Sequence, residues 1–197
     1  MKKILTLAAF LTLAAFTGVV SAQPTHPTFQ AEEMLPAGGA AVGPQGAAYL
    51  TRSSDGLNGR VMVNVDLAGT PHTVWWVIFH RPNRCAAGPG NCMFSDLGNA
   101  QGAVFHASGA ISADNLNNGG VINVDISTVA GRPPEGLFSP VGNGLKRGKG
   151  FCSEVHVVVD DHILDIDEAG NPDYVTDLTT PETNHRFAIF LPTKGCF

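Results

Sequence analysis

The chain has 197 residues, of which 44% are hydrophobic, and a formal net charge of −5. This length suits one domain with its own core. The acidic balance argues against nucleic acid and anionic lipid as partners, because both are bound by clustered Lys and Arg. The chain has one basic loop, LKRGKG at 145–150, which we expect to be a solvated turn.

Residues 1–22 have the pattern of a secretory signal peptide. Lys2 and Lys3 precede the apolar stretch ILTLAAFLTLAAFTGVV, and the small residues Ser21 and Ala22 follow it. We expect cleavage after Ala22 and a secreted or periplasmic mature protein with no membrane span. A membrane anchor is the alternative, although the stretch is barely long enough to cross a bilayer. Cleavage takes the formal charge from −5 to −7, because it removes two Lys and no acid.

The mature chain divides into an extended N-terminal segment, 23–44, and one domain, 45–197. In that domain apolar and polar side chains alternate repeatedly, which is the pattern of strands with one buried face. The clearest case is VMVNVDL, where four apolar side chains share one face. In chain order, the expected strands are 46–53, 61–67, 73–80, 102–111, 121–128, 154–159 and 186–191.

Turn signals rich in Gly, Asn, Asp and Pro separate these segments, and the chain has 23 Gly and 13 Pro. No segment has a convincing helical periodicity. The sequence therefore predicts an all-β fold. A two-sheet antiparallel β-sandwich is the economical architecture, because short strands with one apolar face bury that face against a second sheet.

The segment TVWWVIFH at 73–80 is apolar on both faces, which predicts a central strand covered on both sides. We expect one Trp in the core and the other under the long connection at 81–102. Structural packing is favoured because large aromatic side chains are mostly buried. In the alternative interpretation, Trp76, His80 and His106 line an exposed surface that binds a small molecule, glycan or protein.

Four cysteines in an exported chain predict two disulfides. Three pairings are open, and sequence proximity favours Cys85 with Cys92, which leaves Cys152 with Cys196. From loop-closure entropy the first bond contributes roughly 2–3 kcal/mol and the second about 4 kcal/mol. The second bond also anchors the C-terminus.

The strongest metal-binding candidate is the stretch EVHVVVDDHILDIDE. Glu154 and His156 alternate onto one face of a strand, and Asp160 and His162 follow at its end. Imidazole and carboxylate groups bind divalent metals, which are the only cofactor that the sequence suggests. The favoured interpretation is instead an ordinary solvent-facing edge, because spacing alone does not show that ligands converge.

The sequence does not match the other catalytic and metal-binding motifs that we considered. The stretch DIDEAGNPDYVT superficially resembles an EF-hand loop, but Ala169 and Thr176 occupy its fifth and twelfth positions. The chain has no Gly-x-Ser-x-Gly, no His-Glu-x-x-His and no Gly-rich phosphate loop. Oxidised cysteines supply no thiolate nucleophile. We therefore assign no catalytic residue.

The stretch GAAYLTRSSDGLNGRVMVNVDLAGTPHTVWWVIFHRPNRC, followed later by SEVHVVVDDH, resembles a group of secreted bacterial proteins of uncharacterised function. These proteins share a Trp-Trp-Val-Ile-Phe strand and a Glu-Val-His-Val-Val strand. The front part is also loosely similar to the CHRD module, but it has Trp75 and Trp76 where that module has a His-x-His pair. The resemblance implies a secreted β-sandwich and no established activity.

These patterns predict a secreted or periplasmic, non-catalytic β-sandwich stabilised by disulfides, which binds a ligand or associates with the cell envelope. The alternative is a secreted metal-binding protein, with a redox link, that uses His and carboxylate ligands. Metal analysis separates the two.

Overall fold

The structure is a computed structural model, and the residues that it describes are 26–36, 45–66, 68–114, 119–133, 140–162, 165–166, 172–173, 185–193 and 196. The signal peptide expected at 1–22 and most of the stretch compared with a calcium loop lie outside these residues. Within the described part of the chain, no helix is long and apolar enough to cross a membrane.

The prediction of an all-β fold is confirmed: the described elements are strands and two short 3₁₀ turns. All seven expected strands are present. The strands are β1 (Thr28–Pro36), β2 (Gly46–Arg52), β3 (Gly56–Val65), β4 (Pro71–Phe79), β5 (Gly102–Ile111), β6 (Ala113–Asp114), β7 (Gly120–Val129), β8 (Glu154–Asp161), β9 (Asp165–Ile166), β10 (Pro172–Asp173) and β11 (His185–Phe190), and the 3₁₀ turns are η2 (Pro82–Arg84) and η3 (Phe94–Asp96).

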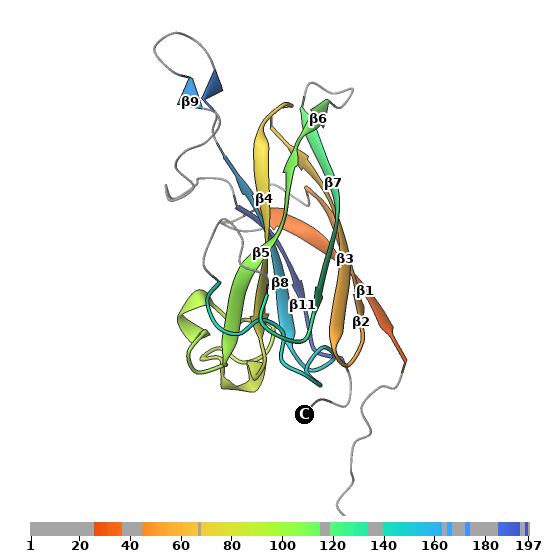
Figure 1. Ribbon diagram of the computed structural model, residues 1–197, viewed down its shortest axis with the longest axis vertical. Helices are drawn as coiled ribbons and strands as arrows, with labels where there is room; N and C mark the ends of the chain where they lie inside the picture. Colours follow the sequence, from red (N-terminus) through yellow and green to blue (C-terminus); the bar gives the residue numbers. More distant parts are fainter. Residues whose placement is uncertain are drawn as a thin grey trace, which may run out of the picture.

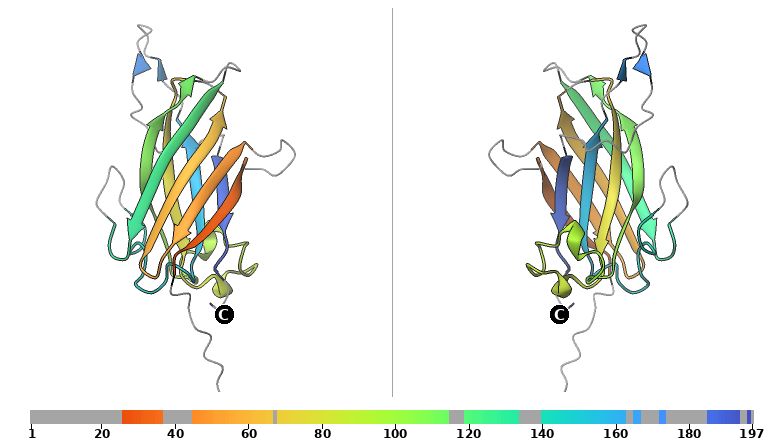
Figure 2. Two further views of the ribbon diagram at one scale, coloured as in Figure 1. Left: turned by 90° about the vertical axis from the view of Figure 1, so that its right-hand side faces the viewer. Right: turned by 90° about the vertical axis from the view of Figure 1, so that its left-hand side faces the viewer.

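Nine strands form one antiparallel sheet in the order β5-β4-β8-β11-β1-β2-β3-β7-β6, and β9 pairs with β10 separately. The sheet bends so that two layers face each other, with β1, β2, β3 and β7 in one and β5, β4, β8 and β11 in the other (Figure 2). β5 also packs against β7, so the sheet is nearly closed and barrel-like. The expected two-sheet sandwich is therefore not confirmed.

Strand β1 explains this difference. It lies inside the segment 23–44, which the sequence pattern leaves outside the domain, yet it pairs with β2 along seven residues. At its end, Leu35 and Pro36 pair with Phe187 and Arg186 of β11. Because β1 bonds to a strand of each layer, the two layers are parts of one sheet.

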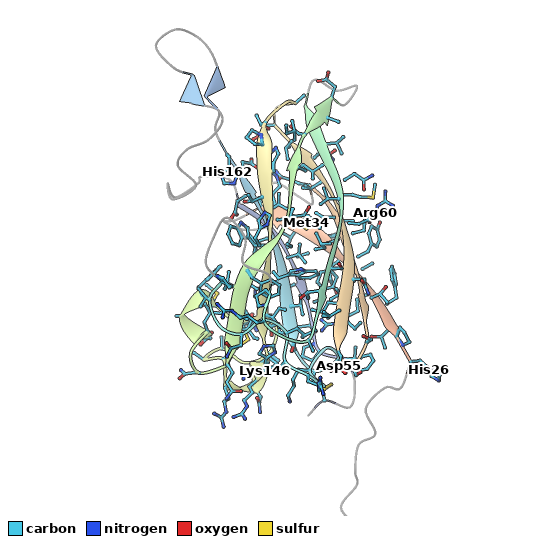
Figure 3. All side chains as sticks on the ribbon, viewed as in Figure 1. His26, Met34, Asp55, Arg60, Lys146 and His162 are labelled. Carbon is cyan, nitrogen blue, oxygen red and sulfur yellow. A yellow bond between two sulfur atoms is a disulfide. The ribbon has the colours of Figure 1, made fainter. Side chains whose placement is uncertain are left out.

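The alternating patterns place the core as expected. On β3, Val61, Val63 and Val65 are buried between the layers, whereas Met62 is exposed. Met34 of β1 is also fully buried and lies in the middle of the molecule in Figure 3. The period of two along each strand therefore separates the core from the outer surface.

Strand β4 is central, as predicted, because it pairs with β5 on one side and β8 on the other. Its inner face, with Trp76, belongs to the main core. On its outer face, Val77 and Phe79 are buried in a second cluster with the disulfide Cys85–Cys92. The connection between β4 and β5 thus covers this face, and it lies at the lower end of the molecule in Figure 1.

Both disulfides are present with the pairing that sequence proximity favours. The Cα atoms are 5.1 Å apart in Cys85–Cys92 and in Cys152–Cys196. The second bond links the residues before β8 to the C-terminal end of the chain. This end lies at the lower end of the molecule in Figure 1, as does the connection between β4 and β5.

Candidate functional site

Of the four candidate metal ligands, the structure brings Glu154 and His156 together on the outer face of β8. Oε1 of Glu154 is 2.7 Å from Nε2 of His156. The Glu154 carboxylate also accepts the backbone N–H of Gly90 at 2.5 Å and that of Cys92 at 3.1 Å. The expectation of a solvent-facing edge is wrong for Glu154, which is fully buried, because the disulfide-closed loop covers it.

Local chemistry fixes the loop that covers Glu154. The Cys85–Cys92 bond closes it, and Gly88 and Gly90 adopt positive φ angles of 80° and 85° that favour glycine. The Asp96 carboxylate accepts the backbone N–H groups of Ala86 at 3.0 Å and Met93 at 2.9 Å. These contacts hold the N–H groups of the loop towards Glu154.

Three donors keep Glu154 ionised despite its burial. Burial alone raises the pKa of a carboxyl group, but here the hydrogen bond from His156 and the backbone N–H groups of Gly90 and Cys92 outweigh that effect and lower the pKa of Glu154. A carboxylate accepts hydrogen bonds, so Nε2 of His156 carries the proton that it donates. In a neutral imidazole Nδ1 is then the acceptor, and Nδ1 of His156 has no partner among the residues that the structure describes.

His156 lies in the lining of a groove with a volume of about 640 Å³. The floor consists of two cross-strand pairs, His156 with Ile189 and Val158 with Phe187. The covering loop forms the wall, where Met93 and Phe94 are 64% and 62% exposed. The complete lining is Ala87, Gly90, Asn91, Cys92, Met93, Phe94, His156, Val158, Asp160, Phe187 and Ile189.

The other two candidate ligands do not converge with this pair. Asp160 lies at the far end of the groove, four residues along β8, which is roughly 13 Å from His156. His162 lies beyond the strand, near the upper end of the molecule in Figure 3, where Nε2 is 2.8 Å from Oγ1 of Thr73. The described residues contain no group of three or more His, Cys, Asp or Glu side chains that could hold a metal ion.

A second polar cluster lies at this upper end, and local sequence gives no sign of it. Asp161 contacts Nδ1 of His72 at 2.9 Å and the Arg186 guanidinium at 2.6 Å and 2.7 Å. Nε2 of His72 is 2.8 Å from Oγ1 of Thr70. Burial raises the pKa of the Asp161 carboxyl group, but His72 and Arg186 outweigh it and lower that pKa.

The order hydroxyl, imidazole, carboxylate is also that of a catalytic triad. A triad needs N–H groups that can stabilise an oxyanion. Two N–H groups close to this hydroxyl in the sequence are already used, because the N–H of Gly69 bonds to the carbonyl of Ser112 and the N–H of Thr70 bonds to the hydroxyl of Ser112. We therefore interpret this cluster as a structural link between β4, β8 and β11.

The alternative of an exposed surface at Trp76, His80 and His106 is wrong. Trp76 is 0% exposed because it points into the core, and His80 is 2% exposed. The half-buried His106 packs against Trp75, not Trp76, with 5.6 Å between ring centroids. Trp75 is the outward tryptophan because neighbouring residues of a strand point to opposite faces.

His80 has a structural role that makes stability depend on pH. Its Nε2 donates to the carbonyl of Gly144 at 2.9 Å, and Nδ1 is 3.1 Å from Oγ of Ser153. Burial lowers the pKa of His80 to about 4, and the charges of Lys146 and Lys149 act in the same direction. The folded protein therefore holds this imidazole neutral.

We expect the free energy of unfolding to fall as the pH falls from 6.5 to about 4, because only the unfolded chain protonates His80 in that window. The loss from this residue amounts to at most about 3 kcal/mol. His80→Gln should reduce the slope of stability against pH, measured by urea unfolding between pH 7 and 4.5. Equal slopes in the two proteins would contradict this role.

Comparisons of the chain with protein-family models, with curated proteins and with solved structures found no match. The resemblances to the Trp-Trp proteins and to the CHRD module therefore remain predictions.

Proposed function

We propose that the protein is a secreted or periplasmic, non-catalytic module that binds a small, largely apolar molecule in the groove beside β8. The groove, with His156 at its floor, is the observation that carries this proposal. Ligand sites are commonly apolar cavities of this size with a few well-placed polar groups. Two disulfides and the signal-like residues 1–22 support export, since disulfides persist in oxidising compartments.

The ligand that fits is neutral or weakly polar and carries one hydrogen-bond donor. Aromatic and aliphatic side chains, including Phe94 and Phe187, supply most of the contact surface. When His156 is neutral, its contact with Glu154 places the proton on Nε2 and leaves Nδ1 as an acceptor. A hydroxyl or an N–H group on the ligand satisfies it.

The lining argues against covalent catalysis. A carboxylate–imidazole pair activates a nucleophile when a Ser, Thr or Cys lies within hydrogen-bond reach of the imidazole. The described lining contains no Ser or Thr, and its cysteine, Cys92, is in a disulfide. The pair therefore serves to orient a polar group of the ligand.

A neutral fluorescent probe with one N–H group, N-phenyl-1-naphthylamine, tests the groove. The wild-type protein should bind one equivalent with a saturable rise in fluorescence. Phe94→Ala should weaken binding by about tenfold, because the ligand loses most of one aromatic contact surface.

Phe29→Ala is the matched control, because Phe29 is 67% exposed and lies outside the groove. It should leave the dissociation constant unchanged. The proposal fails if the wild type shows no saturable binding, or if Phe29→Ala weakens binding as much as Phe94→Ala does.

A further inference from the structure

A second cavity, of about 550 Å³, lies on the other side of the disulfide-closed loop. Pro89 lines this cavity, whereas the next residue, Gly90, lines the apolar groove. The lining of this second cavity is His80, Arg81, Pro82, Asn83, Arg84, Pro89, Lys149, Cys152 and Cys196. These described residues include three permanent cations and no Asp or Glu.

Backbone geometry brings the three cations to one place. Arg81 precedes the 3₁₀ turn η2 and Arg84 is its last residue, with the N–H of Arg84 donating to the carbonyl of Arg81 at 2.8 Å. Side chains three residues apart in such a turn lie on the same side. Lys149 comes from the loop before β8, where its carbonyl accepts the N–H of Cys152 at 3.1 Å and that of Ser153 at 2.9 Å.

The cations of this cluster have no direct ion-pair partner among the described residues, and the nearby Asp55 carboxylate accepts the N–H of Gly148 at 2.6 Å. The side chains of Arg81, Arg84 and Lys149 make no hydrogen bond or ion pair with any residue that the structure describes. The neighbouring Lys146 donates to Oε1 of Gln101, a neutral group, at 2.8 Å. Lys146 lies near the lower end of the molecule in Figure 3, as does Asp55.

We propose that this basic cavity, lined by Arg81, Arg84 and Lys149, is a binding site for a phosphate or sulfate group, either as the free ion or as the ester of a small molecule. Guanidinium groups donate two parallel hydrogen bonds to such oxyanions, and an ammonium group adds a point charge. A bound anion removes the mutual repulsion of the three cations. The site is separate from the apolar groove and does not depend on its function.

Calorimetric titration of the mature protein with inorganic phosphate, glucose 6-phosphate and glucose tests this site. At least one of the two anions should bind saturably, and glucose should not bind. Tighter binding of glucose 6-phosphate identifies an ester as the ligand, whereas equal or tighter binding of inorganic phosphate identifies the free ion. Arg84→Gln and Lys149→Gln should each weaken binding at least about tenfold, because each removes a charged donor.

Arg147→Gln is the matched control, because Arg147 belongs to the same basic loop but does not line the cavity. It should change affinity less than about twofold, since an exposed charge outside the cavity is screened by solvent. The proposal is overturned if neither anion binds below about 10 mM, which is weaker than an ordinary small-ligand site. It is also overturned if Arg147→Gln weakens binding as much as Arg84→Gln. N-phenyl-1-naphthylamine should bind all these variants as it binds the wild type. The proposal for the basic cavity and the proposal for the groove can therefore be refuted separately.

Discussion

Replacing Arg52 with Met is expected to lower the free energy of unfolding by about 3–5 kcal/mol. The Arg52 side chain is fully buried, and it donates to the carbonyls of Gly150 at 3.0 Å, Ser153 at 2.8 Å and Phe190 at 3.0 Å. Methionine has a similar length and no donor. Each buried carbonyl that loses its partner costs roughly 1–3 kcal/mol. Urea unfolding at pH 7 measures the loss.

Arg60→Met is the control for this substitution. Arg60 lies on the neighbouring strand β3, is exposed, and makes one hydrogen bond to Asn123 at 2.9 Å. Its replacement should change stability by less than about 0.5 kcal/mol. Equal losses in the two variants would show that the buried carbonyls do not depend on Arg52.

The position of Arg52 explains the size of this effect. It joins the end of β2 to the residues before β8 and to the end of β11, which are far apart in the sequence. Burial lowers the pKa of its guanidinium to about 10, so the group stays charged at neutral pH. Carbonyl oxygens, together with the side-chain oxygen of Gln30, surround this charge.

The strand pattern of the sequence predicted most of the sheet, since each expected strand has a face that the core buries. The alternation in β2 even places Arg52 on the buried face with Ala48 and Leu50. Strand β1 lacks such a signal. The residues of β1, TFQAEEMLP, do not alternate between apolar and polar, and among the nine only Met34 is buried. Because β1 joins the two layers, the near closure of the sheet could not be predicted without it.

The candidate groove could be predicted only in part. Proximity along the chain predicted the Cys85–Cys92 bond, and alternation placed Glu154 and His156 on one face. The floor also needs Phe187 and Ile189, whose places opposite β8 follow from the register of β11. Register between distant strands is set by tertiary packing, so no local pattern contains it. The basic cavity could not be predicted for the same reason, because its lining combines residues from 80–89, 149–152 and 196.

The two adjacent tryptophans of β4 illustrate how far a local pattern reaches. A run that is apolar on both faces predicted a central strand, and β4 has neighbours on both sides. It did not show which tryptophan points inward. Trp76 is in the core, whereas Trp75 is half-buried on the outer face and donates from its indole N–H to Oγ1 of Thr73 at 2.9 Å. The bulge between Val74 and Trp75 in the pairing with β5 lies beside them.

Trp76→Ala should lower the free energy of unfolding by about 3–5 kcal/mol, because it removes a fully buried indole and leaves a cavity between the layers. Trp76→Phe should cost much less. It keeps an aromatic ring in the core and removes an indole N–H that has no hydrogen-bond partner in the described part of the structure. Trp75→Ala should also cost less than Trp76→Ala, since the Trp75 ring is only half-buried. Urea midpoints of the three variants measure these differences.

Iodide quenching of the single-tryptophan proteins Trp75→Phe and Trp76→Phe gives an independent measurement. The protein that keeps Trp76 should fluoresce at a shorter wavelength and be quenched poorly, because no water reaches a fully buried indole. The protein that keeps Trp75 should be quenched more readily, since its indole lies at the outer surface beside His106. If Trp76 is instead the readily quenched residue, and if Trp76→Ala unfolds at the wild-type urea concentration, then the inner face of β4 is not part of the core.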